Sequence, residues 1–166
     1  APRMSAHKQR TDGLQHPATI DEIHGAALAA IGQALDCDRA SILLFDGAGV
    51  MRFVAWQGLS EGYRRAVEGY SPWGPEERDP KPFGIDDLAT ADLPAPIARA
   101  IDAERIRAAA FVPLVDDTGL IGKFMVYYDT PHAFAEDELE AALTIGRQFA
   151  FGLQRLRAEA ERREAA

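Results

Sequence analysis

Residues 107–128 read RAAAFVPLVDDTGLIGKFMVYY, and this stretch decides the fold. Two apolar runs, 108–115 and 120–128, flank the turn cluster Asp116-Asp117-Thr118-Gly119. Runs rich in Val, Phe and Tyr that are joined by a short Asp/Gly turn are typical of an antiparallel β-hairpin. The sequence therefore predicts a long hairpin here.

Two residues inside this hairpin carry information about the backbone. Pro113 has no N–H, so we expect it where the ladder of hydrogen bonds is interrupted. Gly122 indicates a β-bulge or a close approach of another backbone segment. Strand alternation puts Phe111 and Pro113 on one face of the sheet, and Val112 and Leu114 on the other. The sequence leaves open which of these faces meets the helices.

The rest of the chain predicts helices and strands around the hairpin. Thr19 and Glu22 have the spacing of a capping box at the start of a helix over 19–35. Periodicity and turn signals predict further helices at 60–68, 94–104 and 136–164, and strands at 40–45, 50–56 and 83–88. This order favours the α+β class, with an antiparallel sheet of five or six strands, helices packed on it, and long N- and C-terminal helices.

The chain divides into three parts. Residues 1–17 show no periodicity and are expected to be a disordered leader or linker. Residues 18–157 are expected to form one folded domain. The last helix has apolar positions at near-heptad spacing and then becomes highly charged, so residues 158–166 are predicted to begin a coiled-coil connector. The alternative is a solvated helix end that frays.

Composition argues against several classes of function. The formal net charge of −8 disfavours nucleic acid as a partner, because phosphate binding needs a basic face. We see no apolar run of membrane-spanning length and no secretory signal, so we expect no membrane insertion and a cytoplasmic location. The four histidines lack metal-ligand spacing and Cys37 is the only cysteine, so we expect no metal. The absence of asparagine, beside abundant alanine and arginine, indicates a bacterial source with a GC-rich genome.

Six short motifs follow one another along the chain: the strand at 40–46, Gln57-Gly58-Leu59, Ile85-Asp86-Asp87-Leu88, Phe111-Val112-Pro113-Leu114, Gly119-Leu120-Ile121-Gly122 and Phe134-Ala135-Glu136-Asp137. Their order and spacing resemble the GAF domain family of small-molecule sensory domains. The resemblance covers about residues 20–156. It implies a PAS-related, six-stranded antiparallel sheet with helices packed behind it, terminal helices that dimerise, and a ligand pocket on the other face.

Within this family the chain most resembles the domains of bacterial two-component sensor histidine kinases. That resemblance implies a role in signal transduction beside the other domains of the same sensor protein. A histidine kinase core uses an Asn to hold the Mg²⁺ of ATP, and this chain contains no Asn. We therefore expect no catalytic residues here, and any kinase activity would belong to another part of the parent protein.

The resemblance directs the search for a ligand site to the Pro-rich loop before the third predicted strand. Trp73 could cover a pocket with its flat apolar face, and Arg78 could pair with an anionic ligand. Tyr70 could stack or hydrogen-bond, while Asp87 could orient polar ligand groups. Phe111, from the hairpin, is the fifth candidate. The alternative is that Trp73 only anchors the loop, that Arg78 and Asp87 form a structural ion pair, and that the pocket is empty or vestigial.

Two kinds of cofactor known in the family are disfavoured. Some members carry a bilin on a Cys in the pocket region, but Cys37 falls at the end of the first helix, so we expect no covalent bilin. The cyclic-nucleotide subgroup has an Asn-containing signature from which this Asn-free chain departs, which puts cGMP and cAMP in doubt. The ligand therefore stays unnamed at this stage.

We expect a sensory domain that binds a small molecule or serves as a dimerising signal relay. The homodimer would form through the terminal helices, with the candidate interface residues Ile20, Ile23, Ala27, Leu139, Leu143, Gly146, Phe149 and Leu153. One alternative is a ligand-free module for dimerisation or docking. Another is a small enzyme of the same fold, of the methionine sulfoxide reductase type. Such an enzyme needs several reactive cysteines, so the single Cys37 disfavours it.

Overall fold

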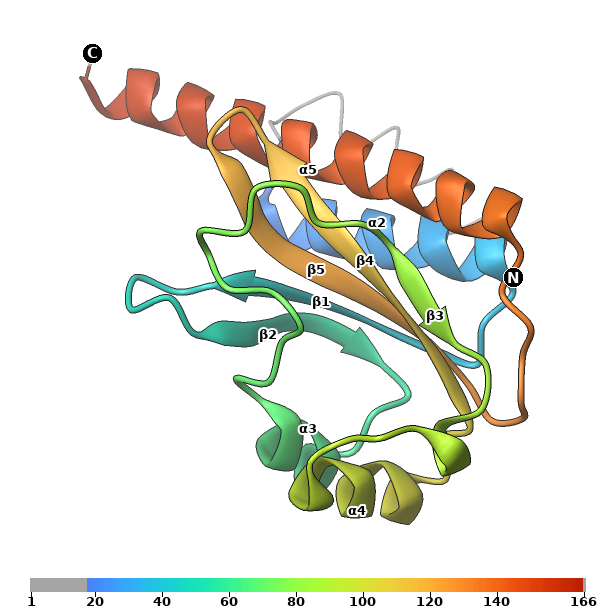
Figure 1. Ribbon diagram of the computed structural model, residues 1–166. Coiled ribbons are helices and arrows are strands. Elements are labelled where there is room, and N and C mark those ends of the chain that lie inside the picture. The colour runs from blue at the N-terminus through green and yellow to red at the C-terminus, as the bar shows by residue number, and fades with distance from the viewer. Residues whose placement is uncertain (1–17, 166) are drawn as a thin grey trace.

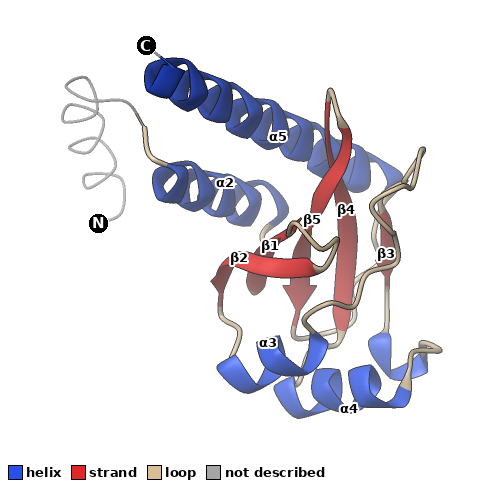
Figure 2. Ribbon diagram, turned by 90° about the vertical axis from the view of Figure 1, so that its left-hand side faces the viewer, coloured by secondary structure: helices blue, strands red, loops and turns tan. Residues whose placement is uncertain are grey.

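The computed structural model describes residues 18–165, which form three layers around one antiparallel sheet (Figure 1). The sheet has five strands in this part of the chain, in the order β2-β1-β5-β4-β3. Helices α2 and α5 cover one face, and the shorter elements lie at the other (Figure 2). The strands are β1 (Arg39–Phe45), β2 (Met51–Gln57), β3 (Phe83–Ile85), β4 (Ala108–Asp116) and β5 (Gly119–Tyr128), and the helices are α2 (Ile20–Leu35), α3 (Glu61–Val67), the 3₁₀ turn η1 (Leu88–Thr90), α4 (Ala95–Glu104) and α5 (Glu136–Ala165).

The predicted α+β class is confirmed, with two differences in the strands. The resemblance implied six strands, whereas residues 18–165 contain five. The Pro-rich chain before β3 joins no ladder, because proline has no N–H to donate. β3 is also shorter than the predicted strand at 83–88, since the Asp87 carboxylate accepts a hydrogen bond from the Ala89 N–H and starts η1. The predicted leader, residues 1–17, lies outside the described part of the chain.

The β4–β5 hairpin has the predicted backbone features. Pro113 lies opposite Lys123 in the β4–β5 pairing, but β3 pairs with β4 only as far as Phe111, so Pro113 lies where the β3–β4 ladder has ended. A Cβ on Gly122 would overlap the carbonyl oxygen of Leu43 on β1, so only glycine allows the two strands this close. The register of the hairpin also shifts beside Gly122 and skips Ile121. Gly122 therefore marks both a bulge and a close backbone approach.

Helix α2 begins with the predicted capping box. The Thr19 hydroxyl accepts a hydrogen bond from the Glu22 N–H at 3.1 Å, and the Glu22 carboxylate accepts one from the Thr19 N–H at 2.8 Å. At its other end, the buried Tyr128 hydroxyl donates to the carbonyl oxygen of Leu35 at 2.6 Å. The last residue of β5 thus fixes the end of α2 against the sheet.

Helix α5, of 30 residues, packs along β4 on the same face and continues unbroken through the predicted connector to Ala165. Gly146 permits this packing, since a Cβ there would lie 3.2 Å from a methyl group of Leu114. Leu153 is fully buried in the same core. Gly146 and Leu153 therefore contact their own sheet and are not available to a second chain, which corrects their assignment to a dimer interface.

Gly122→Ala tests the close approach of β5 to β1. We expect a loss of about 1–3 kcal/mol in the free energy of unfolding, because the new methyl group must push backbone apart rather than move a side chain. Urea denaturation measures the loss. Gly25→Ala is the matched control, since nothing lies within 4 Å of the added methyl group on α2. The control should be neutral or slightly stabilising, and equal stability of the two variants would refute the packing argument.

Candidate functional site

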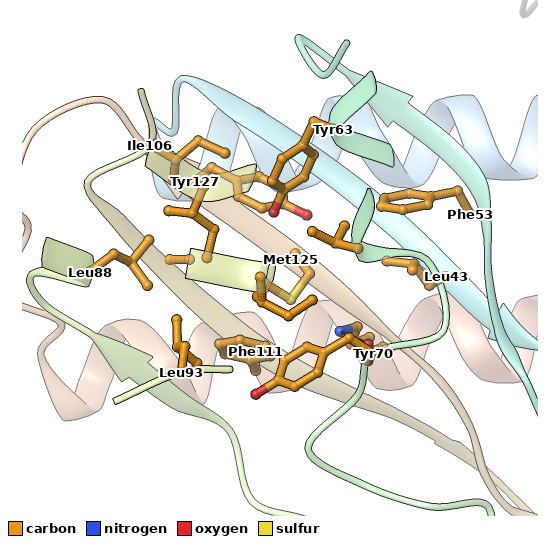
Figure 3. A pocket seen from close by; sticks show the side chains of 15 residues that line it. Leu43, Phe53, Tyr63, Tyr70, Leu88, Leu93, Ile106, Phe111, Met125 and Tyr127 are labelled. Atoms are coloured by element: carbon orange, nitrogen blue, oxygen red, sulfur yellow. Dashed lines mark hydrogen bonds between the residues drawn. The ribbon is translucent and has the colours of Figure 1, made fainter. Parts of the chain in front are cut away.

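A largely enclosed and mainly apolar cavity borders the face of the sheet that lies opposite α2 and α5 (Figure 3). Its volume of about 30 Å³ holds roughly two water molecules. β1, β4 and β5 form its floor, and the helices α3 and α4 cover it. The residues that line it are Leu43, Phe53, Tyr63, Val67, Tyr70, Leu88, Leu93, Ile97, Ile101, Ile106, Ala109, Phe111, Lys123, Met125 and Tyr127.

The structure shows which face of the hairpin lines the cavity and which face meets the helices. Phe111 on β4 points to the cavity, and so do Met125 and Tyr127 on β5. Val112 and Leu114 point to the other face and pack in the core beneath α2 and α5. The same two strands therefore contact the cavity with one set of side chains and the long helices with the next.

Lys123 brings an amine into this apolar cavity. The side chain is only 4% exposed, and its Nζ donates a hydrogen bond to the carbonyl oxygen of Tyr70 at 3.1 Å. The Nζ also lies 5.1 Å from the ring centroid of Phe111 and 5.9 Å from that of Tyr70. Burial lowers the pKa of Lys123 from 10.5 to about 7, because apolar surroundings disfavour the ammonium form. Within residues 18–165, no carboxylate lines the cavity to balance this charge.

Two buried tyrosines supply neutral polar groups at one end of the cavity. The Tyr127 hydroxyl shares a hydrogen bond with the Ser41 hydroxyl at 2.8 Å. Tyr63 packs edge-on against Tyr127 with ring centroids 6.2 Å apart, and the two hydroxyl groups point toward each other (Figure 3). Burial raises the pKa of both tyrosines above the usual value of 10, so both stay protonated at neutral pH.

The helical cover of the cavity is fixed at its edge, and its helix α4 buries little surface. Glu104, the last residue of α4, accepts hydrogen bonds at 2.7 Å from both the N–H and the hydroxyl of Ser60, which caps α3. The same carboxylate lies 3.4 Å from the Arg39 guanidinium of β1. Helix α4 has no fully buried residue, and Ile97 and Ile101 are only half-buried. Elements with so little buried surface are the ones that move most easily.

Two of the five predicted ligand residues, Tyr70 and Phe111, line the cavity. Trp73 does not: it is buried under its loop, with its ring 6.0 Å from Phe83 and edge-on to it. Phe83 in turn stacks on Phe111 at 4.7 Å. Trp73 therefore anchors the loop from the far side of these rings, as the alternative interpretation had it.

Arg78 and Asp87 also lie outside the cavity lining, and they do not pair with each other in the structure. Arg78 is exposed. The Asp87 carboxylate caps η1 and forms an ion pair with Arg107 at 3.2 Å. The Ala89 N–H and the Arg107 guanidinium together lower the pKa of Asp87. Asp87 thus has a structural role at the turn before α4.

Sequence analysis missed Lys123, Tyr63, Met125 and Tyr127. A signal for Lys123 existed, because the chain has only three lysines and this one interrupts an apolar strand. Strand alternation also puts it on the same face as Met125 and Tyr127. Tyr63 could not be found in this way, since it lies on α3 and meets the sheet only through the tertiary fold.

Comparison with known proteins now identifies the fold. A sequence model of the GAF domain matches residues 17–154. The chain belongs to the GAF domain family. A solved domain assigned to a two-component sensor histidine kinase protein of Sinorhizobium meliloti 1021 is 52% identical, with a TM-score of 0.82, and the match covers 87% of this chain and 98% of that one.

More distant GAF domains share the fold alone. GAF3 of Slr1393 from Synechocystis sp. PCC6803, in its photoproduct state, is 17% identical with a TM-score of 0.72, over 86% of this chain and 98% of that one. The blue-light-absorbing PixJ GAF domain of Thermosynechococcus elongatus is 22% identical with a TM-score of 0.71, over 86% and 89% of the two chains. Comparison with curated proteins gave no match.

The only thiol of this GAF domain lies on the opposite side of the sheet from the cavity. Cys37 follows α2 and packs against the core beneath the long helices. Burial raises the pKa of Cys37 to about 11, so the thiol stays protonated at neutral pH. Among the described residues, no group of three or more His, Cys, Asp and Glu could hold a metal ion. None of the described helices is long and apolar enough to span a membrane.

Lys123→Met tests the penalty of burying the amine. The unfolded chain binds a proton near pH 10.5 and the folded domain only near pH 7, so the stability of the wild type falls as the pH drops from 10.5 to 7. At about 1.4 kcal/mol per pKa unit, the penalty at pH 7 is at most about 5 kcal/mol. The Met variant should therefore be more stable than the wild type at pH 7, and this advantage should shrink toward pH 10.

Urea denaturation at pH 7, 8.5 and 10 measures this difference, and comparing the two proteins at each pH cancels the titration of the tyrosines. Lys81→Met is the control, because Lys81 is an exposed lysine paired with Asp79 on the surface. Its effect should not depend on pH in this range. An advantage of Lys123→Met that stays constant from pH 7 to pH 10 would contradict the burial argument.

Proposed function

We propose that this GAF domain is the cytoplasmic sensory module of a two-component sensor histidine kinase, and that it binds a small molecule in the Lys123 cavity. One observation carries the proposal: a mainly apolar cavity contains a buried amine, and the described residues that line the cavity include no carboxylate. Burying an amine in this way is unfavourable, and strongly perturbed ionisable groups in cavities mark functional sites more often than other positions. The 52% identity to the Sinorhizobium meliloti domain supports the kinase context.

The hairpin offers a short path from the cavity to α5. Phe111 and Lys123 line the cavity, while their near neighbours Leu114 and Phe124 contact α5 around Gly146. A ligand that displaces Phe111 or Lys123 would shift the strands on which α5 rests. The signal would be a difference in ligand affinity between two arrangements of α5, which leaves the domain as a single helix (Figure 1).

Methyl NMR of labelled methionine tests ligand binding, because the methionines report on different places. Met125 lines the cavity, whereas Met51 is buried in the same cluster without lining it. We expect at least one member of a mixture of anionic, neutral and cationic fragments to shift the Met125 resonance and leave Met51 nearly unchanged. If no fragment of any charge class shifts Met125, the ligand-binding function fails, and the ligand-free relay becomes the better description.

We further propose that two copies of the domain associate through α2 and α5. An open groove between these helices is lined by Ile23, Ala26, Ala27, Ala30, Ile145, Gln148, Phe149 and Gly152. Of the predicted interface residues, Ile23, Ala27 and Phe149 line this groove, and Ile20 is an exposed apolar residue at the start of α2. Leu139 and Leu143 are partly buried against the core. A small, mostly apolar groove beside a long helix suits packing of helices from a second copy.

Ala26→Glu should disrupt this dimer without harming the monomer. Ala26 is exposed and lines the groove, so a carboxylate there would be buried unpaired between two copies. Ala29→Glu is the matched control, because Ala29 is exposed on the same helix and does not line the groove. Sedimentation at micromolar concentration should show dimers for the wild type and the control, and monomers for Ala26→Glu. A monomeric wild type would rule out the interface.

The reductase alternative finds no support in the site. A catalytic cysteine would have to reach the ligand as a thiolate. Cys37 lies across the sheet from the cavity, and burial raises the pKa of its thiol. A sensory role for the cavity is therefore the better proposal.

A further inference from the structure

The cavity is apolar along most of its wall and cationic at one point. Leu88 and Leu93, from the chain around η1, and Met125, from β5, line it (Figure 3), and so does Ile97 of α4. Lys123 lies beside the Tyr70 carbonyl, which accepts one of its hydrogen bonds. A protonated amine has three N–H donors, so two remain for another acceptor.

We propose that the cavity recognises a small monocarboxylate with an apolar body, whose carboxylate pairs with the Lys123 ammonium. This inference rests on the proposed ligand-binding function and names the class of ligand. A carboxylate supplies the anion that the cavity lining lacks, and charge-assisted hydrogen bonds of this type are the strong ones in proteins. The leucine, isoleucine and methionine side chains would hold the apolar body.

Other ligand classes fit this lining less well. A cationic ligand would meet Lys123 without any acidic residue to balance the two charges. A purely neutral ligand would leave the buried ammonium with the Tyr70 carbonyl oxygen but without an opposite charge. A phosphate or dicarboxylate carries more charge than a single lysine can balance, and the other polar side chains in the lining are those of Tyr63, Tyr70 and Tyr127. One negative charge on a mostly apolar molecule matches one amine in a mostly apolar cavity.

The ligand must displace part of the cover, because a cavity of about 30 Å³ is too small for a monocarboxylate of several carbon atoms. Helix α4 is the part most easily moved, since it has no fully buried residue. Its far end is held by the hydrogen bonds of Glu104 to Ser60. Ligand entry would thus swing α4 outward about the Glu104 end and leave the floor of the cavity in place.

The charge of Lys123 makes binding depend on pH. The other titratable groups that line the cavity are Tyr63 from α3, Tyr70 from the loop and Tyr127 from β5. Arg39 and Glu104 lie near Tyr63 at the rim. Below pH 7 the amine is already charged and binding takes up no proton. Above pH 7 the empty site is neutral, so binding takes up one proton, and the apparent affinity should fall up to about tenfold per pH unit.

Matched pairs of acid and amide test the inference. Benzoate and benzamide, and butyrate and butyramide, share their apolar bodies and differ in charge. We expect the acid of at least one pair to bind roughly 10- to 100-fold more tightly than its amide at pH 6.5, the range of a hydrogen bond to a charged group. Calorimetry gives the affinities, and the Met125 methyl resonance locates the ligand. The affinity for the acid should drop between pH 7 and pH 8.5.

Two variants separate the specific role of Lys123 from the effect of removing any one positive charge from the protein. Lys123→Met should remove the preference for the acid over its amide. Lys81→Met, at an exposed lysine, should keep the preference. Thermal unfolding shows whether each variant is folded, and the comparison of acid with amide in the wild type needs no variant at all.

Three results would overturn the inference while the proposed ligand-binding function stands: equal binding of acid and amide, an unchanged acid preference in Lys123→Met, or binding of only neutral or cationic fragments at Met125. Failure of every fragment, whatever its charge, to shift Met125 would remove the proposed function itself and the inference with it.

Discussion

The two-sided alternation of side chains along β4 and β5 is the constraint on which the rest of the structure depends. Both strands lie inside the sheet, and both of their faces are covered, so nearly every side chain of β5 is buried. One face receives α2 and α5, and the other forms the floor of the cavity. A shift of the register by one residue would exchange the two sets of side chains. The bulge at Gly122 and its close contact with Leu43 hold the register in place.

Much of the fold could be predicted because its signals are local. The capping box of Thr19 and Glu22 marks a helix start within four residues, and the Asp/Gly turn marks the hairpin. Pro113 and Gly122 also constrain the backbone at their own positions, and these constraints do not depend on the surrounding residues. The strand count was harder, since a strand exists only when a partner accepts its hydrogen bonds. β3 ends at Ile85, shortly before the Asp87 side chain caps the next turn through the Ala89 N–H.

The candidate site was predicted only in part, for the same physical reason. Tyr70 and Phe111 line the cavity, but Trp73 is separated from it by Phe83, and Asp87 pairs with Arg107 rather than Arg78. Residue type shows what a side chain can bind, while the fold decides what it meets. Lys123 is the opposite case. A lysine in a strand is normally solvent-exposed, and here tertiary packing, with Tyr70 of the loop beside its amine, takes it out of water.

Lys123 links the stability of the empty domain to the affinity for the proposed ligand. The desolvated amine destabilises the empty fold, because the cavity lining offers it only a carbonyl oxygen and two aromatic rings. A monocarboxylate would relieve that penalty and add its own contacts, so the gain on binding exceeds the contacts alone. Lys123 is adjacent to Phe124, which packs on α5 at Gly146. A change in the charge of Lys123 would therefore occur one residue from Phe124, which contacts the helix that leaves the domain. A sensory domain needs a short mechanical connection of this kind.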